Sequence, residues 1–233
     1  MKQFIVILGL VISVNHASAQ FGNEYAIGIE INPNLVVPEN KIDELNETQS
    51  EFNYSIGLVY STSLNSRINL VTGINYTRIS YSQKDYSTLF PSDFNPATGG
   101  PIIEKSWKED FNDNYYLGIP LEVNIGVSQE NKNLFLKLGY EYLFHAQSEI
   151  NSVLFPCGVE DKLRVFELDN NNLHKLKFGL GYEIKTSSIF SLIIEPEFEY
   201  YVSKIHRDAD LYSNSLVSFG INLKAMMNGS RSL

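Results

Sequence analysis

The sequence predicts an all-β protein, an eight-stranded antiparallel up-and-down transmembrane β-barrel. Three observations predict it: eight segments alternate apolar and polar residues, the glycines of these segments fall on the polar face, and long and short connections alternate between them. Composition alone does not reveal this fold. A chain of 233 residues with 43% hydrophobic residues and a mean hydropathy of −0.13 resembles an ordinary soluble protein.

The N-terminus has the features of a cleaved export signal. Lys2 supplies a positive charge, residues 4–14 are an apolar run, and Ala17-Ser18-Ala19 is a small-residue cleavage site. The apolar run is too short for a membrane-spanning helix. We therefore expect residues 1–19 to be a signal peptide that is removed, residues 20–224 to form the barrel, and residues 225–233 to form a short periplasmic tail.

Each alternating segment is long enough for a tilted membrane strand, and helical spacing explains none of them. In the fourth, every odd-numbered position from Tyr115 to Val127 is apolar or aromatic, while Glu122 lies on the other face. Pro120 and Pro196, both assigned to the lumen face, predict local bulges. The expected strands are residues 25–32, 53–60, 67–77, 115–128, 134–145, 175–185, 190–202 and 217–224.

The glycines indicate which face points inward. Glycine weakens a solvent-facing strand, but the interior of an eight-stranded barrel is just wide enough for side chains to fill, so small residues make room there for long ones. The polar face is therefore predicted to line the lumen and the apolar face to contact lipid. Nine of the fifteen glycines lie in the segments, all on the polar face: Gly28, Gly57, Gly73, Gly118, Gly126, Gly139, Gly179, Gly181 and Gly220.

The charges on the polar face are nearly balanced, with seven acids and six bases. Balance favours a closed lumen, because buried charges must be paired. Glu195, Glu197 and Glu199 occupy successive lumen positions; they are interpreted either as a cation or proton site or, preferably, as partners of nearby lysines. The predicted lumen charge cluster contains Glu30, Arg67, Glu122, Lys137, Glu141, Lys175, Lys177, Glu183, Lys185, Glu195, Glu197, Glu199 and Lys224.

Connections alternate between long and short, as in outer-membrane barrels with long extracellular loops and tight periplasmic turns. The longest loop, 82–113, contains a Pro/Gly-rich stretch from Phe90 to Pro101, followed by Trp107, which is the expected contact surface for a partner. Aromatic residues near the strand ends on the apolar face are expected to mark the membrane interfaces. They are Tyr54, Tyr76, Tyr115, Tyr142, Phe144, Tyr200 and Tyr212 at the outer ends and Tyr60, Tyr182 and Phe190 at the inner ends.

The fourth segment reads Tyr115-Tyr116-Leu117-Gly118-Ile119-Pro120-Leu121-Glu122-Val123. With it, the chain resembles the PorT-like outer-membrane β-barrel domain family of Gram-negative bacteria, which often shows a Tyr-Leu-x-Ile-Pro-Leu strand and a signal peptide ending in Ala-Gln. The resemblance implies an outer-membrane location and, for a few members, a role in a secretion apparatus. Such barrels commonly end on an aromatic residue, whereas this chain ends on Leu233, so Phe219 is expected to serve instead.

Some residues are candidates for chemistry. His145 is expected near the outer rim, where a catalytic imidazole would need an orienting acid and a nucleophile, with Ser148, Glu141 and Glu199 as candidates. A hydrogen-bonded rim histidine is the simpler interpretation. Cys157 excludes an internal disulfide because it is the single cysteine, and it is interpreted as a surface thiol, with intermolecular pairing as the alternative.

We predict a non-enzymatic outer-membrane protein that presents its loops to partners or supports an envelope assembly or secretion system. The alternatives are a narrow channel for small solutes or ions, a lipid-modifying enzyme, and a soluble periplasmic barrel that binds an apolar ligand. An acidic pI of about 5.0 argues against nucleic acid as a partner. No catalytic, cofactor-binding or metal-binding residues are predicted; the expected partners are outer-membrane lipid and, through the loops, other envelope proteins. The oligomeric state stays open.

Overall fold

The structure is a computed structural model that describes residues 24–38, 46–85, 91–94, 101–103, 107–127, 133–155, 159–163, 172–203 and 216–230. These residues form strands and connecting turns, and no helix among them is long and apolar enough to cross a membrane. The predicted signal peptide, Cys157, His206 and Tyr212 lie outside the described residues.

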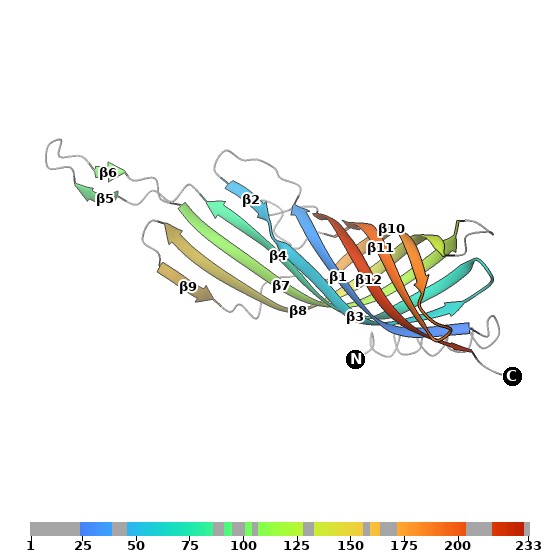
Figure 1. The fold of residues 1–233 in the computed structure, drawn as a ribbon. Coiled ribbons are helices and arrows are strands. Elements are labelled where there is room, and N and C mark those ends of the chain that lie inside the picture. The colour runs from blue at the N-terminus through green and yellow to red at the C-terminus, as the bar shows by residue number, and fades with distance from the viewer. Residues whose placement is uncertain are drawn as a thin grey trace.

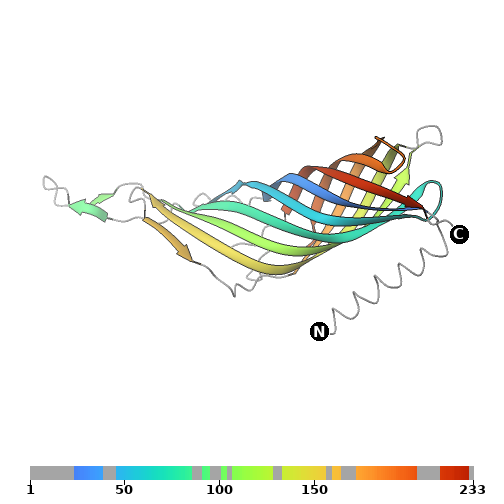
Figure 2. The same ribbon diagram turned by 60° about the horizontal axis from the view of Figure 1, so that its bottom comes forward.

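Eight of the strands close into an antiparallel barrel (Figures 1 and 2), which confirms the predicted fold class. Neighbours in the chain are neighbours in the barrel, and closure comes from β12 pairing with β1 and β10 pairing with β8. The barrel strands are β1 (Glu24–Pro38), β3 (Phe52–Ser63), β4 (Ile68–Asp85), β7 (Trp107–Gly126), β8 (Leu134–Phe155), β10 (Leu173–Lys185), β11 (Phe190–Tyr201) and β12 (Leu216–Ser230).

Three strands continue well beyond the barrel at one end (Figure 1). β4, β7 and β8 remain paired there, flanked by β2 (Asn46–Ser50) on β4 and β9 (Val159–Leu163) on β8. We call residues 82–85, 107–114 and 147–155 with β2 and β9 the sheet extension, and the two ends of the barrel the extension end and the turn end. Beyond it, β5 (Pro91–Phe94) and β6 (Pro101–Ile103) pair with each other.

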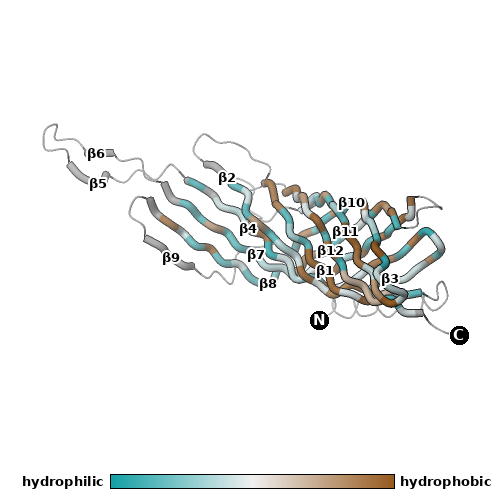
Figure 3. Tube along the Cα trace, viewed as in Figure 1, coloured by the Kyte–Doolittle hydropathy of each residue, from teal (hydrophilic) through white to brown (hydrophobic). Residues whose placement is uncertain are grey.

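The predicted long loops therefore contain strands. They were not recognised as such because most positions of β4, β7 and β8 in the sheet extension are polar, so these parts lack the regular apolar alternation that marks a strand with one buried face. Figure 3 shows the outer face of the barrel to be more hydrophobic.

The outer surface of the barrel is apolar (Figure 3). At mid-height Leu58 is 64% exposed and Ile74 is 61% exposed, and similar side chains face outward from all eight strands. The inward-facing positions are instead mostly polar or charged and buried. The predicted orientation of the two faces is thus confirmed, and the predicted interfacial residues Tyr76, Tyr182 and Tyr200 lie on the outer face.

The predicted bulges at the two prolines are wrong. Pairing on both sides of Pro120 and Pro196 keeps the same register, and Pro196 lies on the exposed outer face between two inward-facing glutamates. Each proline lacks a backbone donor, and this interrupts the pairing with β4 or β10 over two residue pairs without inserting a residue. The register shift in the barrel lies between Tyr115 and Tyr116, opposite an extra residue, Ala146, of β8.

The predicted boundary between the barrel and a tail at residue 224 is also wrong. β12 runs to Ser230, which pairs with Glu24, so residues 225–230 belong to the barrel. Met226 is buried in the lumen and Met227 is 51% exposed on the outer face. The alternation continues, but it was not visible in the sequence because both residues are apolar methionines.

Candidate functional site

The lumen is the most distinctive site of the molecule, and it is filled in three layers. β1 contributes to all three: it supplies Ala26 near the turn end, Glu30 in the middle and Val36 near the extension end. The middle layer is charged and the two outer layers are apolar. This arrangement follows from the position of each residue along its strand.

The middle layer, which we call the lumen cluster, contains six glutamates and four lysines, each at most 5% exposed. Lys137 is central: its Nζ lies 2.7 Å from Glu197 Oε2, 2.9 Å from Glu195 Oε2 and 3.1 Å from Glu122 Oε1. Each of the other three lysines also contacts at least two carboxylates. The members are Glu30, Glu122, Lys137, Glu141, Lys175, Lys177, Glu195, Glu197, Glu199 and Lys224.

The contacts form one continuous chain across the lumen. Lys175 joins Glu199 at 2.8 Å to Glu141 at 2.9 Å, and Lys177 joins Glu141 at 2.9 Å to Glu122 at 3.2 Å. Lys224 then links Glu122 to Glu195 at 3.1 and 3.0 Å. The lysine pairing predicted for the three successive glutamates is therefore present, and the members come from β1, β7, β8, β10, β11 and β12.

Three asparagines complete the cluster, and sequence reasoning missed them. Asn75 Nδ2 donates to Glu141 Oε1 at 3.1 Å, Asn222 Nδ2 donates to Glu30 Oε2 at 3.1 Å, and Asn32 Nδ2 donates to Glu197. Neutral amide donors stabilise carboxylates that lysines alone do not satisfy. The sequence does place all three asparagines on the polar face of their strands. They were missed because only the charged residues of that face were assigned to the cluster.

Three of the thirteen predicted members are not part of the lumen cluster. Arg67 and Lys185 are exposed and Glu183 is only partly buried, because all three lie at the turn end, where the strands meet solvent. Removing two bases and one acid changes the balance, so the buried cluster holds two more carboxylates than ammonium groups. The expectation of near-neutrality was thus too simple, and the amide donors account for part of the difference.

The glycines make the space that the large side chains need, as predicted. A Cβ atom on Gly118 would collide with the Glu141 carboxylate, and one on Gly181 would collide with the Phe135 ring. Because the lumen of an eight-stranded barrel has no spare width, these positions tolerate no side chain unless a neighbour moves.

Apolar layers close the lumen above and below the lumen cluster. At the extension end the outer plug comprises Val36, Ile79, Tyr81, Tyr116, Leu143, Leu173, Tyr201 and Leu216, each at most 4% exposed. At the turn end the inner plug comprises Val59, Val71 and Met226, with Ala26 and Ile193 packed against them. Together with the cluster they place buried side chains at three levels of the lumen.

The rim histidines have different surroundings. His145 Nε2 lies 2.8 Å from Ser148 Oγ, which in turn donates to Asn114 Oδ1 at 2.7 Å. Ser148 is thus the predicted neighbour of His145, whereas Glu141 and Glu199 pair with Lys175 on the other side of the outer plug. Burial lowers the pKa of His145, which follows the last outward-facing aromatic residue of β8 and lies outside the apolar part of the wall.

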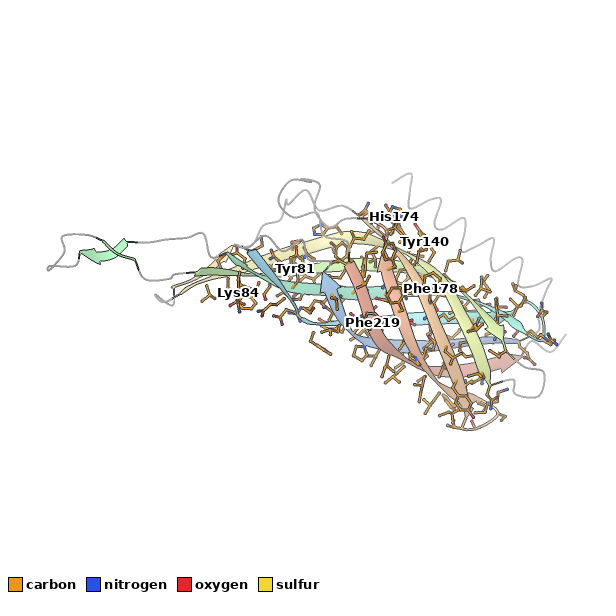
Figure 4. All side chains as sticks on the ribbon, turned by 90° about the horizontal axis from the view of Figure 1, so that it is seen from above. Tyr81, Lys84, Tyr140, His174, Phe178 and Phe219 are labelled. Carbon is orange, nitrogen blue, oxygen red and sulfur yellow. The ribbon has the colours of Figure 1, made fainter. Side chains whose placement is uncertain are left out.

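Two ion pairs lie at the extension end, one where the barrel continues into the sheet extension and one within it. Arg78 Nη2 lies 2.7 Å from Asp113 Oδ1, and Lys84 Nζ lies 3.9 Å from Glu109 Oε1 (Figure 4 labels Lys84). Within the described part of the chain, no group of three or more His, Cys, Asp or Glu residues is placed to hold a metal ion.

No protein-family model matches the chain, and no curated protein matches it. Solved structures that are similar in fold include three outer-membrane or surface proteins. Neisserial surface protein A has 12% identity and a TM-score of 0.42, with 86% of this chain and 95% of that chain covered. The attachment invasion locus protein of Yersinia pestis has 15% identity and a TM-score of 0.39, with 90% and 100% covered. Outer membrane protein OprG of Pseudomonas aeruginosa has 7% identity and a TM-score of 0.41, with 91% and 98% covered.

Proposed function

We propose that the chain is an integral outer-membrane protein whose barrel is a sealed anchor and whose sheet extension is displayed outside the cell. The observation that carries the proposal is the inverted distribution of polarity, with charges buried in the lumen and large apolar side chains exposed on all sides. In water, such a belt would exceed the few hundred Å² of contiguous apolar surface that soluble proteins tolerate. In a bilayer it is the surface that lipid requires.

The sealed lumen favours an anchor over the alternative of a narrow channel. A solute would have to cross both apolar plugs and separate the ion pairs of the lumen cluster, in which Lys137 alone has three carboxylate contacts. Breaking a buried pair costs about 3–5 kcal/mol for one partner. Planar-bilayer recordings should therefore show no conductance steps, and steps of stable size would contradict this part of the proposal.

The sheet extension supports a role in contacting partners. It carries charges on its faces, and β9 forms one of its edges, pairing only with β8 among the described strands. An edge strand offers unpaired backbone groups to another protein. The resemblance to the PorT-like family supports the finer proposal that the partner belongs to an envelope assembly or secretion system.

Two measurements test the proposal. The protein should require detergent for extraction and should change its gel mobility on heating; extraction in plain buffer would support the soluble alternative. Cys157, the single cysteine, falls in the sequence between the last residue of β8 and the first residue of β9. Because both strands belong to the sheet extension, the proposed orientation predicts that a membrane-impermeant maleimide labels Cys157 on intact cells. Labelling only after the outer membrane is permeabilised would show that the proposed orientation is inverted.

The enzyme alternative retains one observation in its favour, the 2.8 Å contact between His145 and Ser148. Ser148 is only 2% exposed and donates to Asn114, which suits a structural bond better than a nucleophile. The lipid A profile of a His145→Ala strain decides between them: an unchanged profile removes the enzyme, and an altered profile establishes it.

A further inference from the structure

A polar cluster interrupts the apolar outer wall at the extension end, between β8 and β10. We call Tyr140, Tyr142, Asn172 and His174 the rim cluster. His174 pairs in register with Tyr142, and its side chain lies beside Tyr140 on the outer side of the wall (Figure 4). The ring centroids of Tyr142 and His174 are 4.9 Å apart in an edge-on arrangement. The cluster is therefore a fixed arrangement and not four separate surface residues.

The hydrogen bonds of the rim cluster leave donors unused and occupy acceptors. The Tyr140 hydroxyl lies 2.6 Å from His174 Nδ1. A phenol is the better donor and an imidazole nitrogen the better acceptor, so Tyr140 donates and the ring proton is on Nε2. Asn172 Nδ2 donates to the Tyr142 hydroxyl oxygen at 2.9 Å, while Asn172 Oδ1 accepts from the backbone of His145 at 3.1 Å. His174 Nε2–H and the Tyr142 O–H thus remain as donors.

The hydrogen-bond partners of the rim cluster are all neutral. Its hydrogen-bond partners are phenols, an amide, the backbone and the Ser203 hydroxyl, which accepts from the His174 backbone at 2.7 Å. On β4, the outward-facing Arg78 is by contrast already paired with a carboxylate, that of Asp113, at 2.7 Å. Among the described residues the rim cluster has no such carboxylate in its hydrogen bonds, so its donors are available to an external negative group.

The position of the rim cluster selects a lipid as the source of that group. Along β10 the outward-facing residues below His174 are apolar, with Phe178 44% exposed and Leu180 45% exposed, and on β8 Leu136 and Leu138 are 50% and 47% exposed. An acyl chain can lie on this surface while its headgroup lies against His174 and Tyr142. A free phosphate ion would use only the donors and gain nothing from the apolar surface below.

We propose that the rim cluster binds the phosphate-bearing headgroup of an outer-leaflet lipid. This rests on the proposed outer-membrane location. His174 Nε2 and the Tyr142 hydroxyl donate to the phosphate oxygens, and Tyr140 holds the imidazole in the required tautomer. The binding of the lipid involves no covalent step.

Native mass spectrometry of the detergent-purified protein tests the proposal. The probes are diphosphoryl lipid A, its dephosphorylated form and phosphatidylglycerol, and the measured quantity is the apparent Kd of the first bound lipid. Wild type should prefer the diphosphoryl form. His174→Phe keeps an aromatic ring but removes the donor, and should weaken that binding about tenfold, the effect of about 1.4 kcal/mol. Tyr142→Phe should weaken it in the same direction.

The matched control is Tyr182→Phe, because Tyr182 is on the outer face of β10 at the turn end and is 44% exposed. Equal binding by wild type, His174→Phe and Tyr182→Phe would overturn the proposal, as would indifference of the wild type to phosphate. If His174→Phe weakens the binding of both phosphatidylglycerol and diphosphoryl lipid A, the site recognises phosphate in general. If it weakens the binding of lipid A alone, the site recognises a phosphorylated sugar.

The two levels of the proposal fail differently. Each variant is first checked for heat-dependent gel mobility and vesicle insertion. If wild type lacks both, the outer-membrane proposal fails whatever lipid binds; if wild type has both and the variants bind lipid normally, only the rim-cluster proposal fails.

Discussion

Replacing Lys137 with methionine removes the cation at the centre of the lumen cluster while keeping a side chain of similar length. Lys137 Nζ contacts Glu122, Glu195 and Glu197 at 2.7–3.1 Å, and its side chain is fully buried. After the substitution, Glu197 has lost its lysine partner and keeps only the amide of Asn32. The variant therefore tests whether the cluster holds the barrel together.

The magnitude follows from the three contacts. Each N–O pair at this separation is worth about 5–6 kcal/mol at an effective dielectric constant of about 20. Desolvation of the ammonium group offsets most of this sum, and removing one partner of a buried ion pair has a net cost of about 3–5 kcal/mol. We expect Lys137→Met to lower the free energy of unfolding by about that amount, because its carboxylates remain buried and carry an uncompensated charge.

Urea unfolding of the protein in lipid vesicles measures the effect, with the heat-dependent gel shift reporting the folded fraction. Lys185→Met is the matched control: Lys185 is exposed at the turn end, so its substitution should change stability by less than about 0.5 kcal/mol. Adding Glu197→Gln to Lys137→Met removes one uncompensated carboxylate and should recover part of the loss. A Lys137→Met change as small as that of the control, or no recovery in the double variant, would refute the reasoning.

Three other variants examine separate parts of the molecule. Gly73→Ala should destabilise the barrel by about 1–3 kcal/mol, because its Cβ would collide with the backbone of Leu58, whereas Gly126→Ala, whose nearest contact would be 3.5 Å, should be nearly neutral in the same urea assay. Because burial lowers the pKa of His145, the folded state binds a proton at this residue less readily than the unfolded state does. The free energy of unfolding should therefore fall as pH drops below about 6.5. Urea midpoints measured across pH should show a weaker dependence in His145→Phe. A double-mutant cycle on Arg78 and Asp113 should give a coupling of at most about 1 kcal/mol that weakens with salt, since both side chains are partly exposed; strong coupling at high salt would contradict this.

The sequence predicts the barrel well because a strand between lipid and a filled lumen must alternate. The fourth predicted strand, residues 115–128, corresponds to the part of β7 that lies in the barrel wall. Its inward-facing residue Glu122 is a member of the lumen cluster. The remainder of β7, from Trp107 to Asn114, is predicted as a loop, because six of its eight residues are polar and they occupy both faces, so no regular alternation marks it as a strand. The outer plug was missed for the related reason that Leu143 and Tyr201 are apolar residues on the face expected to be polar.

Other features depend on contacts between distant strands. Nothing local to Asn75 indicates that its amide binds Glu141, 66 positions away in the chain. The rim cluster likewise combines residues from β8 and from the start of β10, and its donors are apparent only when each hydrogen bond is assigned. Counting charges in the sequence predicted most members of the lumen cluster but not the ratio of acids to bases in it. The sequence does not show that Arg67 and Lys185 are exposed and lie outside the buried layer.

The lumen cluster also bears on how the barrel finds its closing register during assembly. The first and last strands must meet, and Glu30 of β1 lies directly opposite Lys224 of β12 when they do. A slip of one residue would turn one of these charges toward the acyl chains, and a slip of two would place Lys224 opposite Gly28 or Asn32 and pull it away from Glu122 and Glu195. We therefore expect the ion pairs of Lys224 to favour the native register at closure, because a misregistered seam would leave buried charges unpaired.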